Sequence, residues 1–353
     1  MIRSAFSHSA LIVVLGVFLF SWNSTTLLAQ QKQVKAVTIG FYNVENLFDT
    51  INQEGVNDEE FTPEGINHYT GKRYMIKLNN LSDVISQIGS EIDPKGLMAL
   101  GVSEIENRSV LEDLIKMPKL AGRNYGIVHF DGPDARGVDV GLIYRQDLLQ
   151  VTSARSVRLR IPEMPDFKTR DQLVVGGIFD GQQIYIIVNH WPSRRGGQEA
   201  SAHLRNAAAS LVKKSVDSLY AINPKAAVLI MGDLNDDPVD ESVVKYLGAE
   251  GKKNKVADKG LFNPMWQIFK DGNGSLAYRD SWNLFDQIIV SQPLLDQNNK
   301  YRFYQARIFN KPFLLQKEGQ FKGYPFRTYV GNDFKGGYSD HLPVYVILVS
   351  ETK

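Results

Sequence analysis

Short apolar runs that end in polar residues recur along the chain. The clearest run is Val228–Met231, which ends at Gly232 and precedes four polar residues: Asp233, Asn235, Asp236 and Asp237. A short apolar run that ends at a glycine is typical of a buried strand that stops at a surface. Asp233 and Asn235 are two positions apart, so in an extended chain their side chains point the same way. This stretch is therefore a candidate for chemistry at a strand end.

The same residues also have a purely structural interpretation. Asp236 or Asp237 would cap the N-terminus of a helix, with Pro238 at its first position. Capping accounts for two of the four polar residues. It does not account for the Gly-Asp-Leu-Asn sequence that precedes them. The rest of the chain therefore has to distinguish the structural from the functional interpretation.

Further elements follow from the hydrophobic pattern. We expect strands at 36–42, 96–102, 125–130, 138–144, 151–160, 172–179, 183–188, 282–290, 302–309 and 342–349. Helical spacing predicts helices at 74–88, 110–115 and 198–220, whereas 50–70, 248–274 and 313–339 are irregular. Adjacent strands joined by short turns outnumber strand–helix–strand units. The pattern therefore favours an α+β fold with largely antiparallel sheets.

The N-terminus has the pattern of a signal peptide. Arg3 precedes an apolar run at 10–20, which is too short for a comfortable membrane span. We expect a signal peptide over 1–29 that is cleaved after Ala29, with an uncleaved anchor as the alternative. Residues 30–353 then form one domain of an exported protein, periplasmic or secreted, which has no stable membrane anchor after cleavage and is a monomer.

Composition narrows the possible functions. The 353 residues carry a formal charge of +1, and Arg3 is the only charged residue of 1–29, so the chain after Ala29 is neutral. A neutral chain shows no bulk attraction to nucleic acid or membrane. Cysteine is absent, which excludes disulfides and thiolate metal sites. No phosphate-binding P-loop, nucleophile elbow or dinucleotide fingerprint is present in the sequence.

Polar sets lie at the ends of five predicted strands: Asn43, Glu104, Asn189-His190, Asp233-Asn235 and Asp340-His341. A sixth candidate, Asp286, interrupts an apolar strand, where a carboxylate is costly unless it is paired. Each residue alone has a structural explanation, but the recurrence at five strand ends does not. Carboxylate and amide oxygens suit Mg²⁺ or Mn²⁺, and Ca²⁺ as a further candidate, rather than Zn²⁺. Such a site fits phosphoester hydrolysis.

The ordered motifs resemble the endonuclease/exonuclease/phosphatase superfamily, which has the deoxyribonuclease-I-like fold. They are Asn43-Val-Glu-Asn, Ser103-Glu-Ile-Glu-Asn, Gly137-Val-Asp-Val-Gly, Asn189-His-Trp, Gly232-Asp-Leu-Asn, Phe285-Asp-Gln-Ile-Ile and Ser339-Asp-His. The resemblance covers about residues 36–349. It implies a four-layer α/β/β/α sandwich with two central, mainly antiparallel sheets and a site at one end of the strands.

The resemblance also implies roles for individual residues. Glu104, Asn43 and Asp340 would hold the metal, and Glu106 is the competing ligand by spacing. Asp286 would pair with His341, Asp233 would orient or deprotonate water, and Asn235 would hold a phosphoryl oxygen. His190 would stabilise the transition state or protonate the leaving oxygen, with Asp139 orienting it. Ser339 and Trp191 would shape the site.

Arg194 and Arg195 follow His190 in a loop that leaves the site strand directly. Functionally, they would grip phosphates on either side of the scissile bond. Structurally, two arginines on a loop are ordinary solvated surface. We adopt phosphate binding by Arg194 and Arg195 as the prediction.

These features predict a metal-dependent phosphodiester hydrolase, preferably an exported endonuclease that cuts DNA or RNA. The alternative is a phosphatase or phosphodiesterase for lipid or sugar phosphates, similar to a sphingomyelinase. The lipid alternative needs an exposed apolar hairpin, which only 313–315 and 321–326 are placed to supply. A third class is a non-catalytic binding protein on the same fold, which is disfavoured because each motif keeps a chemically competent residue.

Overall fold

Two β-sheets form the centre of the molecule. The computed structural model describes residues 34–351. The strand order in the first sheet is β14 (Arg302–Ile308), β17 (Val344–Glu351), β1 (Val34–Leu47), β2 (Ala99–Ile105), β4 (Asp139–Arg145) and β3 (Tyr125–His129). The order in the second is β5 (Leu149–Val157), β6 (Gln172–Phe179), β7 (Gln182–His190), β8 (Ala227–Asp233), β13 (Asp286–Ser291), β10 (Leu261–Phe262) and β9 (Ala249–Glu250).

Within the described residues, only the pairs β1–β2, β7–β8 and β9–β10 are parallel. The remaining strand pairs are antiparallel, including those of two small hairpins. These hairpins are β11 (Leu276–Tyr278) with β12 (Ser281–Asn283), and β15 (Tyr329–Val330) with β16 (Asp333–Phe334).

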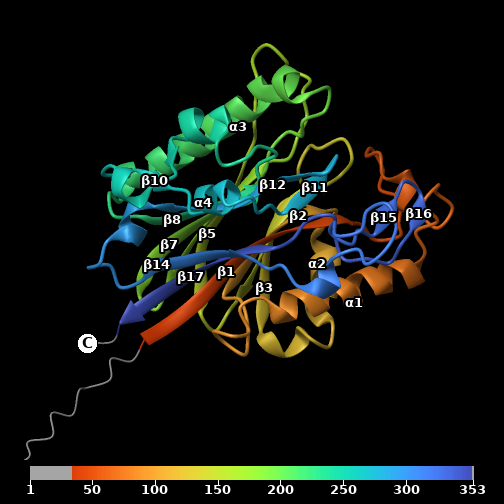
Figure 1. The fold of residues 1–353 in the computed structure, drawn as a ribbon, viewed down its shortest axis with the longest axis horizontal. Helices are drawn as coiled ribbons and strands as arrows, with labels where there is room; N and C mark the ends of the chain where they lie inside the picture. Colours follow the sequence, from red (N-terminus) through yellow and green to blue (C-terminus); the bar gives the residue numbers. More distant parts are fainter. Residues whose placement is uncertain (1–33, 352–353) are drawn as a thin grey trace, which may run out of the picture.

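Helices cover the outer faces of both sheets. They are α1 (Gly71–Gln87), α2 (Arg108–Lys116) and α3 (Gln198–Ile222). The short α4 (Met265–Lys270) packs instead against the core between the sheets. Figure 1 shows α3 on one side of the sheets and α1 with α2 on the other. Because strand side chains alternate between faces, Ile39 and Phe41 of β1 pack between the sheets while Tyr42 packs in the cluster that contains α1. The predicted four-layer α+β sandwich is confirmed.

The strand register brings the motif residues to one edge of the sheets. Asn43 of β1 lies opposite Ser103 of β2, and His190 of β7 lies opposite Asp233 of β8. Asp233 also lies opposite Asp286 on the other side of β8. Gly232 permits this close pairing, because a Cβ at this position would lie 2.3 Å from the Asn189 carbonyl oxygen.

Several local predictions were wrong. The predicted strand 282–290 is divided: β12 pairs with β11, and β13 begins at Asp286, because the buried Leu284 donates its backbone NH to Asp237 instead of continuing a ladder. Asp286 therefore begins a strand rather than interrupting one. The expected helix at Pro238 is absent from the described residues there, and the next helical turn is Ser242–Tyr246.

Short elements lie within the regions predicted as irregular. They include α4, the hairpin of β15 and β16, and single helical turns at Glu59–Phe61 and Lys253–Lys255, with Pro312–Leu314 at the edge of one region. The hairpin of β11 and β12 and the turns at Ala121–Arg123 and Gln292–Leu295 lie outside these regions. Within residues 34–351, none of the helices has both the length and the apolar character needed to cross a membrane. The predicted signal peptide lies outside the described residues.

Candidate active site

The carboxylate of Asp233, at the end of β8, lies at the centre of the polar cluster. Its Oδ2 accepts a hydrogen bond from Asn43 Nδ2 at 3.0 Å. The same oxygen lies 3.6 Å from His190 Nε2 and 3.9 Å from His341 Nε2. The structure thus brings together residues from β1, β7, β8 and the segment before β17, as the strand-end pattern predicts.

His341 and Asp286 form a buried pair. Nδ1 of His341 lies 2.6 Å from Asp286 Oδ2. Ser339 fixes the backbone here, because its hydroxyl donates to the Asn43 carbonyl and accepts from the His341 NH. Burial alone would lower the pKa of His341, but the charge and hydrogen bond of Asp286, with the charge of Asp233, raise it well above its usual value. The imidazole therefore carries a positive charge at neutral pH.

His190 has the opposite protonation preference. Burial, together with the positive charges of Arg170 and Arg136, holds the pKa of His190 well below its usual value. Arg170 is a residue that the sequence did not reveal: it is buried and donates to the Trp191 carbonyl and to Asp134. The two histidines thus present a neutral and a charged imidazole on either side of Asp233.

The predicted orientation of His190 by Asp139 is wrong. The Asp139 carboxylate lies 3.3 Å from His129 Nε2 and accepts a hydrogen bond from the Gly132 NH. Nδ1 of His190 has no hydrogen-bond partner among the described residues. The reason is that Asp139 begins β4, which lies beside β3 and its His129 rather than beside β7.

Asp233 and Asn235 are linked by a tight turn. The Asn235 NH donates to Asp233 Oδ1 at 3.0 Å, and Asn235 takes a left-handed backbone conformation with φ of +50°. Asparagine tolerates this conformation better than most residues. Its Nδ2 donates to the Trp191 carbonyl, which orients the side chain. Burial and the nearby Asp286 raise the pKa of Asp233, and His341 opposes them, leaving it at about 6.

Glu104, not Glu106, belongs to the cluster. Glu104 has a left-handed φ of +60°, and its Oε1 lies 3.9 Å from His190 Nε2 while Oε2 accepts from the Asn46 NH. Glu106 instead accepts from the Asp49 NH, three residues further along the chain than Asn46. Burial, with the neighbouring Asp49, raises the pKa of Glu106 to about 7.

Asp340 is shared between the cluster and a neighbouring arginine. Its Oδ1 lies 4.0 Å from His341 Nε2, whereas its Oδ2 accepts from Arg327 at 2.8 Å. Arg327 also donates to Glu45, a buried residue of β1. Glu45 further accepts from the Thr328 NH at 2.6 Å and lies 3.8 Å from Nζ of the buried Lys77 in α1. Sequence reasoning assigned no role to Glu45, Lys77 or Arg327.

Arg194 does not have the free guanidinium that phosphate binding requires. It donates to Asp240 at 2.7 Å and to the Asn235 carbonyl at 2.9 Å, and it lies 3.2 Å from Asp236. Its guanidinium carbon lies 4.4 Å from the Phe285 ring centroid. The prediction for Arg194 is therefore corrected: it holds the loop after β8 in place. Arg195 is exposed.

Asp236 and Asp237 also serve the scaffold. Asp236 lies 2.7 Å from Nε of the fully buried Arg205 in α3, and Asp237 accepts from the Leu284 NH. The alternative interpretation of one of them as a helix cap is therefore wrong, because both carboxylates are used in tertiary contacts. Burial, opposed by the Leu284 NH and Arg194, raises the pKa of Asp237 to about 6.

The donor set fits a divalent ion with oxygen ligands. Glu104 and Asp340 contribute carboxylates. Asn43 contributes an amide oxygen, which also accepts from the Glu45 NH, while its Nδ2 donates to Asp233. Hard oxygen donors of this kind match Mg²⁺, Mn²⁺ or Ca²⁺. Because Arg327 uses Oδ2 of Asp340, Oδ1 is the oxygen that remains for an ion.

Comparisons with solved structures place the fold among known ones. The chain is similar to an endonuclease/exonuclease/phosphatase family protein from Bacteroides thetaiotaomicron (18% identity, TM-score 0.53, covering 90% of this chain and 96% of that one). It is also similar to TDP2 from D. rerio in complex with a single-strand DNA product (14% identity, TM-score 0.51, covering 89% of this chain and 98% of that one). A mannosyl-6-phosphatase from B. thetaiotaomicron is similar as well (16% identity, TM-score 0.51, covering 88% of this chain and 99% of that one).

Sequence comparison assigns the family. No curated protein matches the chain. The model of the endonuclease/exonuclease/phosphatase family matches residues 38–350, which is nearly all of the described chain. The resemblance inferred from the motifs is confirmed, and the chain belongs to the endonuclease/exonuclease/phosphatase family.

Proposed function

We propose that the protein is a metal-dependent phosphoesterase. The proposal rests chiefly on the position of Asp233 Oδ2, which lies within 3.9 Å of both site histidines. A carboxylate between a neutral and a charged imidazole can orient a water molecule and accept its proton. The charged imidazole can then stabilise negative charge on phosphorus-bound oxygen.

Each remaining side chain supports this chemistry. Asp286 holds His341 in orientation and favours its charged form. Asn235 has one amide proton on the Trp191 carbonyl and a second that is free to bind a phosphoryl oxygen. His190 is placed to stabilise the transition state or to return a proton to the leaving oxygen. Asn43, Glu104 and Asp340 would hold Mg²⁺ or Mn²⁺, which neutralises charge on a phosphoryl oxygen when bound.

Two substrate classes agree with this site. The first is the phosphodiester backbone of DNA or RNA, which the sequence favoured. It is supported by the similar fold of TDP2 with its single-strand DNA product. Arg194 no longer supports it, because its guanidinium binds Asp240 and the Asn235 carbonyl instead of being free for a phosphate. The second is a lipid or sugar phosphate, supported by the similar fold of the mannosyl-6-phosphatase. We also propose export, on the apolar run at 10–20 and the residues that flank it.

A substrate panel tests the proposed function. The protein from residue 30 onward is assayed with bis-p-nitrophenyl phosphate, p-nitrophenyl phosphate, supercoiled plasmid, single-stranded RNA, sphingomyelin and sugar phosphates, each with Mg²⁺, with Mn²⁺ and with EDTA. We expect turnover of at least one substrate, its loss in EDTA and its recovery with added metal. Activity that resists the chelator would contradict the metal assignment, and inertness toward every ester would contradict the phosphoesterase.

A further inference from the structure

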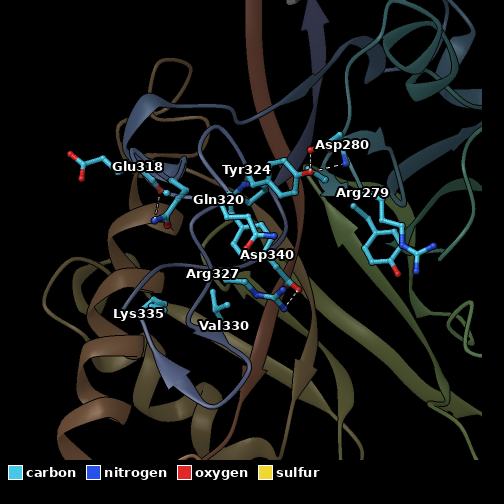
Figure 2. Close-up of a pocket in the computed structure, with 15 residues that line it drawn as sticks. Arg279, Asp280, Glu318, Gln320, Tyr324, Arg327, Val330, Lys335 and Asp340 are labelled. Carbon is cyan, nitrogen blue, oxygen red and sulfur yellow. Dashed lines mark hydrogen bonds and ion pairs between the residues drawn. The ribbon is translucent and has the colours of Figure 1, made fainter.

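A pocket of about 640 Å³ opens beside the active site. Its lining includes Asp340, the metal-ligand candidate, and Arg327, which binds that carboxylate. We call it the Arg327 pocket. Figure 2 shows Arg279 and Asp280 on one side, Glu318 on the other, and Tyr324, Gln320, Arg327 and Asp340 between them. A phosphate on a metal ion held by Asp340 would therefore lie beside this pocket, which has room for its ester group. The volume lies within the usual range of small-molecule sites, about 300–1,000 Å³.

The walls of the pocket come from separate segments that are bonded together. The Tyr324 hydroxyl donates to Asp280 Oδ1 at 2.6 Å and accepts from the Asp280 NH at 2.7 Å. This contact ties the turn between β11 and β12 to the segment around residue 324. Arg327 ties the same segment to Glu45 of β1 and to Asp340. The pocket is thus joined to the active site by defined contacts and is not merely a gap between loops.

The charges that line the pocket cancel. Its lining has three basic residues, Arg279, Arg327 and Lys335, and three acidic residues, Asp280, Glu318 and Asp340. A channel for a nucleic-acid strand needs an excess of positive charge along its path, because each nucleotide adds a phosphate. A neutral lining instead favours a ligand part that carries no charge beyond the phosphate in the active site.

The lining combines aromatic rings with many hydrogen-bonding groups. Tyr278, Phe321 and Tyr324 contribute rings, and the Arg279 guanidinium carbon lies 5.2 Å from the Tyr278 ring centroid. Glu318 offers acceptors, Lys335 offers donors, and the Gln320 amide offers both. Hydroxyl groups both donate and accept, and the C–H face of a sugar ring packs against an aromatic face. A lipid tail, in contrast, would cover these charged and polar groups without supplying hydrogen bonds to them.

We propose that the Arg327 pocket binds the alcohol part of the substrate and that this part is a sugar, so that the protein hydrolyses sugar phosphates. The inference rests on the phosphoesterase function proposed above. In the reaction, a water oxygen forms a bond to phosphorus and the bond from phosphorus to the sugar oxygen breaks. The sugar oxygen takes up a proton, and the products are the free sugar and inorganic phosphate.

The test compares ester classes and measures binding directly. The protein from residue 30 onward, with Mg²⁺ and Mn²⁺, is assayed on the 1- and 6-phosphates of glucose, mannose and galactose, on single-stranded DNA and on p-nitrophenyl phosphate. Binding of the same sugar phosphates is measured by calorimetry on the Asp233→Asn variant, which should bind without turnover. We expect at least one sugar phosphate to bind and to exceed both other substrates in kcat/KM.

Two exposed tyrosines provide a matched pair of variants. Tyr278 lines the pocket and is 60% exposed, whereas Tyr304 lies on the edge strand β14 and is 65% exposed. Loss of the ring in Tyr278→Ala should lower kcat/KM for the preferred sugar phosphate at least about tenfold, mainly through KM. Tyr304→Ala should leave it unchanged. Both variants should unfold at the wild-type midpoint, because both side chains are largely solvated.

The outcomes separate the two proposals. Cleavage of single-stranded DNA, with the sugar phosphates neither bound nor turned over, would overturn the pocket assignment and keep the phosphoesterase. Sugar-phosphate turnover that Tyr278→Ala and Tyr304→Ala leave equally unaffected would also overturn the pocket assignment. Sugar-phosphate binding that Tyr278→Ala weakens, in a protein that hydrolyses no ester, would support the pocket and reject the phosphoesterase.

Discussion

Asp286 Oδ2 lies 2.6 Å from Nδ1 of His341, and the two side chains come from β13 and from the segment before β17, 55 residues apart in the chain. Asp286 is fully buried, so its charge acts on the imidazole with little screening by water. The pair fixes the orientation of the ring and keeps Nε2 directed toward Asp233 and Asp340.

The Asp286→Asn variant tests the importance of that charge. The amide keeps the shape and an acceptor for Nδ1 but removes the negative charge that favours the imidazolium. We expect kcat to fall about 100-fold or more, as is usual when a general acid or base loses its proper protonation. Circular dichroism should show an intact fold. A variant that retains wild-type kcat would show that the charge on His341 plays no part in turnover.

Arg194 and Arg195 should behave differently when they are replaced. Arg194→Ala removes the ion pairs to Asp236 and Asp240; Asp236 keeps Arg205, but Asp240 loses its cation. We expect a loss of about 1–3 kcal/mol in the free energy of unfolding, measured in urea. Arg195→Ala changes an exposed side chain and should cost less than about 0.5 kcal/mol. Equal stability of the two variants would contradict the structural role of Arg194.

Lys77 and Glu45 should depend on each other. Lys77 is almost fully buried and donates to the Tyr338 carbonyl, and its Nζ lies 3.8 Å from Glu45 Oε2. Lys77→Met should destabilise the fold by about 1–3 kcal/mol, because Glu45 loses one of its two cations and keeps only Arg327. Adding Glu45→Gln should restore part of that loss. Thermal and urea unfolding of the single and double variants would show this, and strictly additive effects would contradict the coupling.

Asp237 should make stability depend on pH. Its folded-state pKa of about 6 exceeds the usual value of about 3.9. Between about pH 4 and 6 the folded state keeps a proton that the unfolded state releases, so stability falls as pH rises through this window. Asp237→Asn keeps an acceptor for the Leu284 NH and removes this contribution. The variant should gain about 1–3 kcal/mol relative to the wild type from pH 4 to 6.

Urea unfolding of both proteins at several pH values measures this difference. Other carboxyls titrate in the same range in both proteins, so their contributions cancel in the comparison. A difference in stability between the two proteins that stays constant from pH 4 to 6 would mean that the pKa of Asp237 is not raised.

The sequence predicted the site residues that lie next to apolar strands. The run before Gly232 identifies β8, and its register with β7 and β13 brings His190, Asp233 and Asp286 together. The family motifs supplied the pairing of Asp286 with His341, which no local pattern contains. The choice of Glu104 over Glu106 also agrees with the structure, since Glu104 lies 3.9 Å from His190 whereas Glu106 binds the Asp49 NH.

Long charged side chains were the main source of error. Arg194 follows the site strand closely in the chain, but this position does not determine where its guanidinium binds. The guanidinium donates hydrogen bonds to four acceptors in the loop after β8 and in α3: the Asn235 carbonyl, Asp237, Asp240 and Gln198. Lys77 and Thr328 are 251 residues apart, and Arg327 and Glu45 are 282 apart. Contacts over such separations leave no local signal in a single sequence.

The kcat of Asp233→Asn decides whether the cluster around Asp233 is the active site. It is measured on the best substrate of the panel and compared with the kcat of the wild type and of Asp258→Asn. Asp258 is an exposed aspartate outside the site, so its variant controls for the loss of a carboxylate. We predict that Asp233→Asn loses at least about 100-fold in kcat while Asp258→Asn loses nothing, with all three proteins folded. Full activity in Asp233→Asn would contradict the assignment of this cluster as the active site.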